Sequence, residues 1–495
     1  MSSKFYLTTP LYYVNDVPHI GHAYTTIAAD VLARYKKKMG FEVFFLTGTD
    51  EHGQKVDDAA KEAGQETQDY INQIVKRFNE AWQKLDVEYS HFIRTTDDSH
   101  VKAVQAVFEE LKKKGDIYEG EYEGWYCRPC ETFWTELQLK EIASNPKEYV
   151  CLTCKRPVER LKEKTFFFKQ SKYAEKLKKH IEKHEDFILP TSRRNEILKF
   201  IEQGLRDLSI SRTTFSWGVP VPGKKGHVIY VWFDALINYI SSRGYPDRKK
   251  LKEGWPADVH LMGKEIVRFH AVTWPCMLMA LDLPLPKKIF GHGWWTVEGK
   301  KMSKSKGNVV DPLALAKEYG VDAVRYFLMR EVPFGVDGDF SKRSFIKRYN
   351  SDLANDLGNL LSRTLTMVDK YFKSQIPNHK SQTIPKLQSP NIEQHMDRLA
   401  FSDALVEIWK LVNKANNYIE QEAPWKLAKA GETDKLAAVM YNLCDVLRVS
   451  AVLVAPFMPE TAEKMRQQLG LKSLDAPIAG VKVKKGEPLF PRIQT

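Results

Sequence analysis

Apolar and polar residues alternate in blocks over about residues 1–115, and each block has the length of a strand or a helix. Apolar runs that end near Thr9 and Leu46 predict two buried strands. Amphipathic spacing predicts helices over about 25–39, 65–85 and 98–114. Strands that alternate with helices are typical of an open parallel sheet. We therefore expect a doubly wound α/β domain, although the sequence has neither a GxGxxG nor a Walker loop.

The same pattern returns over about residues 221–330. The apolar run 228–234 predicts a strand that leads into a helical segment at 235–240. Residues 260–265 predict another strand-to-turn junction, with the Glu265 carboxylate at its end. These segments predict a second half of the same sheet.

From residue 349 to the end the spacing becomes helical. Helices are predicted over about 350–372, 391–419 and 434–453, with a polar, proline-containing loop between the first two. Long helices joined by short links are typical of an α-helical bundle.

Two CxxC pairs lie in the segment between the two α/β halves. They predict a metal site whose ligands are Cys127, Cys130, Cys151 and Cys154. Four thiolates at this spacing favour a tetrahedral Zn²⁺ ion over iron or disulfides. Four protein ligands leave no open position for a substrate, so we expect a structural zinc that helps to fold a small polar module.

The net charge of +12 and the pI near 9.1 favour a polyanionic partner. A diffuse, solvated basic surface is the alternative that charge alone leaves open. No run of about 18 apolar residues is present, so no membrane span is expected. Because the N-terminus leads straight into a strand, we expect a cytoplasmic protein.

Two short polar motifs carry candidate phosphate chemistry. His19 and His22 lie at the start of the first helix, where backbone N–H groups and the helix dipole suit a phosphate. Alone, such a pair is more often a capping or packing feature. Lys301 and Lys304 lie in a loop rich in lysine, serine and glycine and can present two ammonium groups to phosphates.

In this order, the two motifs (HIGH and KMSKS) resemble the signature pair of class I aminoacyl-tRNA synthetases. Further matching runs occur at 10–15, 48–53, 204–212, 230–235 and 423–425, and the CxxC pairs lie among them. Together they resemble the methionyl-tRNA synthetase family over nearly the whole chain. The resemblance implies activation of L-methionine with ATP to methionyl-adenylate, release of pyrophosphate, and transfer of methionine to the 3′-terminal adenosine of tRNA(Met).

The resemblance also implies a role for each matching residue. The catalytic residues would be His19, His22, Lys301 and Lys304. The ATP site would consist of His19, Gly21, His22, Gly263, Glu265, Lys301, Ser303 and Lys304, with Mg²⁺ accompanying the nucleotide. The methionine site would consist of Leu11, Tyr13, Asp50, Trp232, Ala235, Leu236, Tyr239 and His270. Asn359, Arg363 and Trp425 would read the anticodon. Many relatives have proline in place of Leu236 or aspartate in place of Glu265, and both departures are mild.

Pattern and resemblance together predict a Rossmann-type doubly wound α/β sheet with a zinc-knuckle insertion, followed by an all-α anticodon-binding bundle. The predicted domains are a first catalytic half with HIGH (1–115), a connective insertion with the zinc knuckle (116–220), a second catalytic half with KMSKS (221–330), a linker or stem region (331–348) and the bundle (349–495).

Two other classes of function compete with this one. Leucine or isoleucine enzymes of class I normally need a large editing insertion, for which the chain has no room. A cysteine enzyme places zinc at its substrate with a mixed ligand set. A non-catalytic RNA-binding relative would be expected to have lost HIGH or KMSKS. Many relatives also carry a C-terminal oligonucleotide-binding-fold module. We expect this chain to lack that module, which a separate tRNA-binding chain could supply.

Overall fold

The structure is a computed structural model that describes residues 3–15, 17–128, 132–134, 136, 139, 149–152, 154–301, 310–378 and 389–494. The chain divides into two compact units. Unit 1 comprises Met1–Pro18, Gly40–Gln83 and Val87–His292, and unit 2 comprises His19–Met39, Lys84–Asp86 and Gly293–Thr495.

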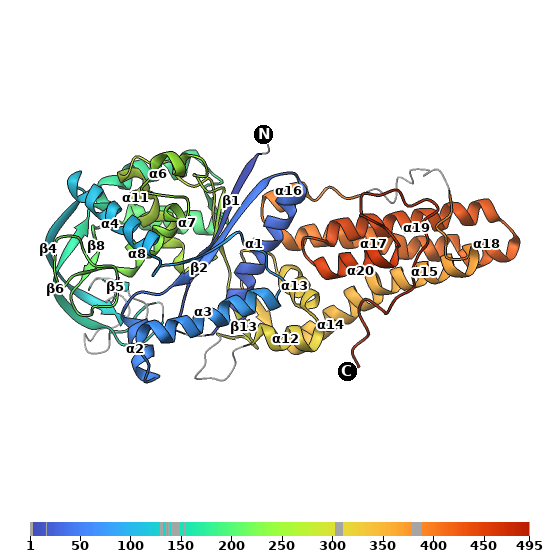
Figure 1. The fold of residues 1–495 in the computed structure, drawn as a ribbon, viewed down its shortest axis with the longest axis horizontal. Coiled ribbons are helices and arrows are strands. Elements are labelled where there is room, and N and C mark those ends of the chain that lie inside the picture. Colours follow the sequence, from blue (N-terminus) through green and yellow to red (C-terminus); the bar gives the residue numbers. More distant parts are fainter. Residues whose placement is uncertain are drawn as a thin grey trace. The chain divides into compact units, whose positions relative to one another are not determined.

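A six-stranded parallel sheet lies at the centre of unit 1 (Figure 1). Its order is β3 (His91–Arg94), β2 (Glu42–Asp50), β1 (Lys4–Tyr13), β11 (Val259–Gly263), β12 (Ile289–His292) and β7 (Ile188–Leu189). β1 pairs with β2 on one side and with β11 on the other, so the winding direction reverses beside β1. Ligands bind at such a switch point, beyond the carboxyl ends of the strands. The predicted doubly wound sheet is confirmed.

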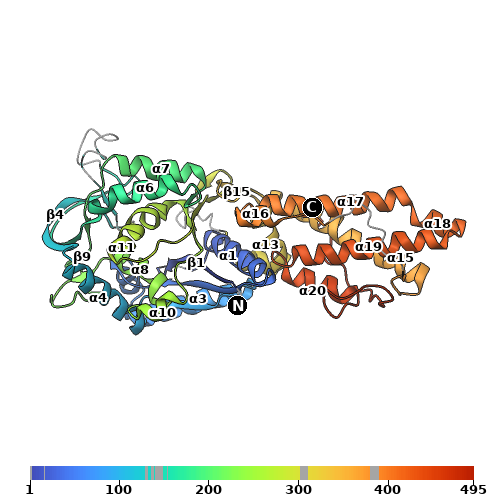
Figure 2. The ribbon, with the colours of Figure 1, turned by 90° about the horizontal axis from the view of Figure 1, so that it is seen from above.

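The helices of unit 1 support the predicted alternation with strands. The helices predicted over 65–85 and 98–114 correspond to α3 (Thr67–Lys84) and α4 (Asp98–Lys113). The other α-helices are α2 (Gln54–Glu62), α6 (Ala174–Lys183), α7 (Thr191–Glu202), α8 (Val231–Leu236), α9 (Asn238–Ser241), α10 (Arg248–Lys252) and α11 (Trp274–Ala280). α6 and α7 lie side by side (Figure 2).

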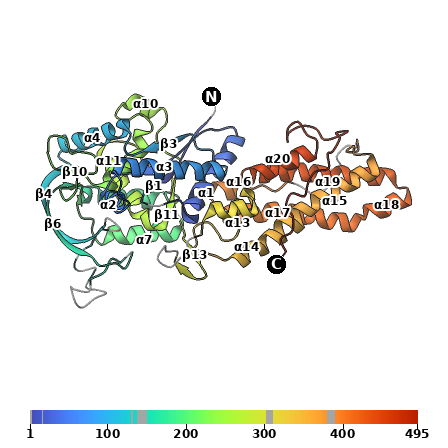
Figure 3. The ribbon, with the colours of Figure 1, turned by 60° about the horizontal axis from the view of Figure 1, so that its bottom comes forward.

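The insertion into unit 1 contains an antiparallel sheet with the order β5, β4, β6, β8. Its strands are β4 (Ile117–Cys127), β5 (Thr132–Trp134), β6 (Glu159–Phe168) and β8 (Leu208–Ser209), and a separate pair is formed by β9 (Ser211–Arg212) and β10 (Val228–Ile229). The long strands β4 and β6 run together along most of their length (Figure 3).

The strand predicted over 228–234 is wrong beyond Ile229. β10 ends there, and α8 begins at Val231. A short apolar run is ambiguous between a strand and a buried helix, and here every residue of α8 is buried. The helical turn also places Asp234 where buried histidines can donate to it.

Unit 2 is mostly helical. Its α-helices are α1 (Ile20–Lys38), α12 (Pro312–Tyr319), α13 (Val321–Arg330), α14 (Lys342–Arg348), α15 (Asn359–Phe372), α16 (Glu393–Asp397), α17 (Phe401–Glu422), α18 (Pro424–Ala430), α19 (Thr433–Val454) and α20 (Pro459–Gln468). A small sheet has the order β14 (Lys300–Lys301), β13 (Trp295–Val297), β15 (Gly338–Phe340). α15, α17 and α19 run side by side in all three views (Figures 1–3), which confirms the predicted bundle.

Two of the predicted bundle helices are interrupted. The segment predicted over 350–372 begins as a π-helix, Tyr349–Gly358, and continues as α15. The helix predicted over 391–419 is split between α16 and α17, because Leu399 adopts a left-handed φ of 60°.

Helix α1 packs within unit 2 through buried charge. Asp30 on α1 accepts from Arg325 on α13 at 2.5 Å, and both side chains are fully buried. The Arg325 guanidinium also donates to the carbonyl oxygens of Leu85 and Phe457. Removing one partner from such a pair would leave an uncompensated buried charge.

Helix α19 is long and apolar enough to cross a membrane by length and composition, and it is the one such helix among the described residues. Half of its most apolar window is buried inside the protein. It packs against α17, α18 and α20, which is how a core helix of a bundle behaves.

Candidate functional site

Aromatic side chains gather in unit 1 around the carboxyl end of β1. The Trp232 ring of α8 stacks on Phe269, with ring centroids 4.0 Å apart and planes within 5°. Tyr13, the last residue of β1, meets Trp232 edge to face at 6.5 Å. His270 meets the same indole at 6.3 Å. This cluster brings together three of the predicted methionine residues and provides the apolar, polarisable surface that a thioether favours.

The remaining predicted methionine residues are also in unit 1. Ala235 and Leu236 continue α8, at 7% and 1% exposure. Leu11 precedes Tyr13 by two positions on β1, and both are partly buried against the main core. α8 and the end of β1 therefore supply most of the predicted side-chain pocket.

Tyr239 and His270 form a buried polar pair. The His270 Nδ1–H donates to the Ile266 carbonyl at 3.0 Å, so the neutral ring accepts the Tyr239 hydroxyl at Nε2, 2.8 Å away. Burial lowers the pKa of His270 to about 4, so the imidazole is uncharged near neutral pH. A neutral pair can face an uncharged sulfur without desolvating an ion.

Asp50 ends β2 and is 4% exposed. The next residue, Glu51, is fully buried and accepts from Arg94 at 2.8 and 3.0 Å and from Thr49 at 2.6 Å. Gly48 allows β2 to pass β3 closely, since a Cβ there would lie 2.0 Å from the Ile93 carbonyl oxygen. The hydrogen bonds of Glu51 and the close approach of β2 to β3 therefore hold the turn that carries the Asp50 carboxylate.

Gly263 and Glu265 lie at the carboxyl end of β11, as predicted. Glu265 is exposed in a short 3₁₀ turn, Lys264–Ile266. Its carboxylate folds back over Gly263, where a Cβ would lie 2.5 Å from Oε2. A carboxylate in this position of a doubly wound sheet can accept hydrogen bonds from ribose hydroxyls.

His19 and His22 in unit 2 form a capping box at the start of α1. The Gly21 N–H donates to His19 Nδ1 at 3.1 Å, and the His19 N–H donates to His22 Nδ1 at 3.3 Å. The rings stack at 3.8 Å. With Nδ1 accepting, a neutral ring carries its proton on Nε2. The capping interpretation is therefore correct. In the capping arrangement each ring keeps an N–H group at Nε2 that can donate a hydrogen bond.

Part of the KMSKS motif lies outside the described residues. The backbone of Lys301 belongs to β14, whereas Ser303 and Lys304 fall in the range that the structure does not describe. Their predicted roles stay predictions.

Three of the four predicted metal ligands come together in unit 1. The sulfur atoms of Cys127, Cys151 and Cys154 all lie within 4.8 Å of one another, with Cys127 and Cys154 3.5 Å apart. Tetrahedral zinc with bonds of about 2.3 Å places its sulfurs about 3.8 Å apart. The cluster can therefore hold a metal ion. Cys130 lies outside the described residues.

The predicted anticodon residues lie on two helices of unit 2. Asn359 begins α15 and is exposed, and Arg363 is one turn further along. Arg363 donates to Glu420 of α17 at 2.7 Å, in a solvent-exposed pair. Trp425, in the first turn of α18, is 40% exposed. An exposed indole of this kind can stack on an unpaired base.

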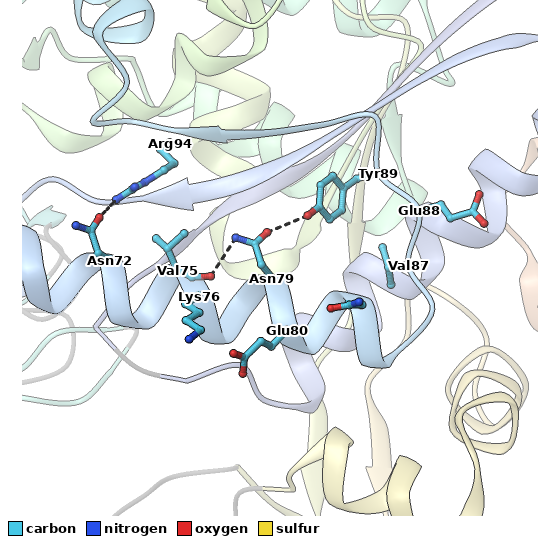
Figure 4. Close-up of a pocket in the computed structure, with 10 residues that line it drawn as sticks. Asn72, Val75, Lys76, Asn79, Glu80, Val87, Glu88, Tyr89 and Arg94 are labelled. Carbon is cyan, nitrogen blue, oxygen red and sulfur yellow. Dashed lines mark hydrogen bonds between the residues drawn. The ribbon is translucent and has the colours of Figure 1, made fainter.

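A separate groove of about 770 Å³ runs along one face of α3 in unit 1 (Figure 4). Asn79 donates toward the backbone of its own helix and accepts from Tyr89 at 2.9 Å, while Asn72 accepts from Arg94 at 2.8 Å. None of the predicted site residues lines this groove.

Sequence reasoning missed several residues that shape the site. Phe269 stacks on Trp232, and its position directly before His270 was the available signal. Asp234 and His52 lie inside runs that carried the resemblance, but no role was attached to them. His100, the second histidine on Asp234, lies in no motif.

Two family models match the chain. The first is described as "tRNA synthetases class I (M)" and matches residues 5–365. The second is described as "Anticodon binding domain of methionyl tRNA ligase" and matches residues 379–484.

Curated relatives match over the full chain. The methionine–tRNA ligase of Caldanaerobacter subterraneus subsp. tengcongensis is 54% identical over 513 residues, which cover 100% of this chain and 79% of the relative. That of Clostridium tetani is 50% identical over 515 residues, covering 99% of this chain and 78% of the relative.

Solved structures show the same fold. Mycobacterium tuberculosis methionyl-tRNA synthetase in complex with methionyl-adenylate has a TM-score of 0.94 at 40% identity, covering 99% of this chain and all of that one. The apo form of that enzyme has a TM-score of 0.86 at 37% identity, covering 100% of this chain and 99% of that one.

Proposed function

This chain belongs to the methionyl-tRNA synthetases of class I, and we propose the residues with which it performs that reaction. It is a methionine–tRNA ligase. It transfers the adenylyl group of ATP to L-methionine, which gives methionyl-adenylate and pyrophosphate. It then transfers methionine to the terminal adenosine of tRNA(Met). The single observation that carries the residue assignments is the buried cluster of Trp232, Tyr239 and His270 near the carboxyl ends of the central strands.

The proposed methionine site divides into an apolar slot and a charged end. Leu11, Tyr13, Trp232, Ala235, Leu236, Tyr239 and His270 form the slot, and Asp50 holds the α-ammonium. An unbranched thioether fits an aromatic slot, and its sulfur can face the neutral Tyr239–His270 pair. One methylene is worth only about 1–3 kcal/mol in such a pocket, so we expect weak but detectable activation of homocysteine.

The proposed chemistry needs positioning more than acid–base catalysis, because the attacking methionine carboxylate is already ionised. His19 and His22 donate from Nε2 to ATP phosphates, with Gly21 allowing the close approach, and Lys301, Ser303 and Lys304 hold the leaving pyrophosphate. Gly263 and Glu265 hold the ribose. Mg²⁺ bound with ATP neutralises charge on the phosphates.

We assign the metal of the cysteine cluster as structural zinc, with Cys127, Cys130, Cys151 and Cys154 as ligands. The short distances among three of the sulfurs support this assignment, since a four-thiolate site is typical of zinc. The expected content is one zinc per chain. Cys127→Ser is expected to lower it to less than half and to expose the surrounding hydrophobic cluster to proteolysis.

The tRNA contacts are assigned to unit 2. Trp425 stacks on an anticodon base, while Asn359 and Arg363 read base edges from α15. The match of residues 379–484 to an anticodon-binding model supports the placement of Trp425, whereas Asn359 and Arg363 lie before that range. A separate tRNA-binding chain stays a prediction without support from the structure or the comparisons. Because ATP, methionine and tRNA meet in the cytoplasm, the proposal places the enzyme there.

The proposal keeps the domain boundaries predicted from the sequence. They are residues 1–115 and 221–330 for the catalytic halves, 116–220 for the insertion, 331–348 for the linker or stem, and 349–495 for the anticodon-binding bundle. Limited proteolysis with identification of the cut sites would check these boundaries.

The test of the proposed function is ATP–pyrophosphate exchange with each of the twenty amino acids, without tRNA. We expect exchange with methionine alone, apart from a weak signal with homocysteine tested beside them. Exchange with another amino acid would overturn the pocket assignment and keep the fold. No exchange with any amino acid, with and without tRNA, would overturn the catalytic proposal.

A further inference from the structure

A buried carboxylate joins three segments of unit 1 beside the proposed methionine pocket. Asp234 of α8 accepts from His52 Nδ1 at 2.7 Å and from His100 Nε2 at 2.8 Å. Asp234 and His100 are fully buried, and His52 is 6% exposed. His100 Nδ1 in turn lies 2.8 Å from the Ser241 hydroxyl of α9. The histidines come from the turn after β2 and from the first turn of α4.

The protons of this cluster can be assigned from its partners. A carboxylate only accepts hydrogen bonds, so His52 donates from Nδ1 and His100 from Nε2. Burial alone would raise the pKa of Asp234, but the two histidines hold that pKa below its usual value. The carboxylate is therefore charged, and both of its oxygen atoms are bonded. A buried carboxylate with both oxygen atoms bonded fixes the relative position of the segments that it joins.

These segments carry the two halves of the proposed methionine site. His52 follows Asp50 by two positions, so its bond fixes the turn that presents the ammonium-binding carboxylate. Asp234 lies between Trp232 and Ala235 on α8, which form the slot for the side chain. The same turn has a second attachment, because Arg94 donates a hydrogen bond to the Glu51 carboxylate.

We propose that Asp234, with His52 and His100, is a positioning device that sets the Asp50 turn at the correct distance from α8 for methionine. The cluster does not touch the substrate in this role. It aligns the ammonium site with the side-chain slot, so that one ligand can occupy both at once. This inference rests on the proposed function, because it takes Asp50 and α8 as the two ends of the methionine site.

The test compares two ligands on the wild type and on Asp234→Asn. One ligand is L-methionine, and the other is its desamino analogue, which keeps the thioether and the carboxylate but has no α-ammonium. Asparagine has nearly the same shape, but its amide offers one acceptor oxygen where the carboxylate offers two, so one of the two histidine N–H bonds is lost. We expect the variant to bind methionine roughly tenfold more weakly, and to bind the analogue within about twofold of the wild type. Equilibrium binding by titration calorimetry measures both.

The outcomes separate this inference from the proposed function. Equal weakening of both ligands would mean a general disturbance of the pocket and would overturn the positioning role, as would no weakening of either. If the wild type did not bind methionine, the proposed function itself would fail.

Two further variants provide an alternative to Asp234→Asn and a matched control. His52→Ala cuts the link to the turn and leaves the His100–Asp234 bond to hold α8, so it is expected to reproduce the selective loss if Asp234→Asn does not fold. Asp322→Asn is the matched control, because Asp322 is a buried carboxylate in unit 2 that accepts from the Thr461 backbone N–H. It is expected to lower stability without changing the ratio of the two affinities.

Discussion

The proposed methionine pocket of unit 1 and the proposed anticodon face of unit 2 recognise their ligands in different ways. The pocket residues Trp232, Tyr239 and His270 are all at least nine-tenths buried, and they contact one another. On the helix face, Trp425 is 40% exposed and Arg363 forms a solvent-exposed ion pair. The buried pocket residues are held in place by contacts with one another, whereas the face presents separate side chains to water.

This difference predicts how each region responds to mutation. Buried, mutually bonded groups share one geometry, so a single change disturbs several interactions. Exposed side chains act more independently, and exposed charge pairs are screened by solvent. Neutralising a charged side chain should therefore be more costly in the pocket than on the face.

The largest effect is expected for Asp50→Asn, which removes the proposed partner of the methionine ammonium. Breaking a buried charge pair costs about 3–5 kcal/mol, or roughly two to four powers of ten in kcat/KM for methionine. The KM for ATP should change little. Methionine-dependent ATP–pyrophosphate exchange measures both constants. A loss of less than tenfold would show that the ammonium is held elsewhere.

The candidate site residues whose positions could be predicted from the sequence share a local origin. Asp50, Gly263 and Glu265 lie at strand ends, and the carboxyl end of a parallel strand is where ligands bind. The CxxC spacing brings thiolates together whatever the surrounding fold. The position of a functional residue can be predicted without the tertiary structure when a short stretch of sequence determines it.

The residues that the sequence did not predict depend on contacts between distant segments. His52 and His100 lie 182 and 134 positions from Asp234, and no local spacing links them. Residues 231–234, for which we predicted a strand, form a helix for a similar reason. The secondary structure of a short apolar run depends on the buried residues that pack around it. Tertiary packing decided both features.

Acidification should affect the two units in opposite directions. Burial lowers the pKa of His270 to about 4, so the unfolded chain binds a proton that folded unit 1 does not. Stability from this group is complete above about pH 6.5 and falls by about 3 kcal/mol as the pH falls toward 4. In unit 2, burial and the nearby Asp352 raise the pKa of Asp356 to about 6, so its contribution is lost as the pH rises through 6.

Hydrogen exchange at several pH values, corrected for intrinsic rates, would resolve the two responses. Peptides from unit 1 should lose protection between pH 6.5 and 5, and the loss should be smaller in His270→Gln. Equal loss of protection in both units would contradict the expected contrast.

Trp425→Ala should weaken tRNA recognition by about 1–3 kcal/mol, the usual value of stacking one base on an aromatic ring. The KM for tRNA(Met) in aminoacylation is expected to rise by about ten- to a hundredfold. Exchange without tRNA should stay unchanged, because that half-reaction does not use unit 2's helix face. Trp425→Phe, which keeps an aromatic face, should recover part of the loss. An unchanged KM in Trp425→Ala would remove this residue from the proposed interface.

Tyr239→Phe should cost about 1–2 kcal/mol in methionine activation, because it leaves His270 Nε2 without its hydroxyl donor. The expected change is a rise of roughly tenfold in the KM for methionine. Tyr245→Phe is the matched control, since that hydroxyl is in unit 1 and donates to Glu110 at 2.9 Å, away from the predicted pocket residues. Similar effects from both variants would point to stability rather than to the pocket.

The smallest effect is expected for Glu420→Gln, which neutralises the partner of Arg363 on the helix face. Exposed ion pairs contribute at most about 1 kcal/mol, so thermal stability should hardly change. If Arg363 reads an anticodon base, it must leave Glu420 to do so, and the variant should then bind tRNA(Met) up to about threefold more tightly at low salt. Fluorescence titration with tRNA at two ionic strengths checks this. Weaker binding would mean that Glu420 positions Arg363 for the RNA, and the side chains of the exposed face would then be held by their own contacts, as those of the pocket are.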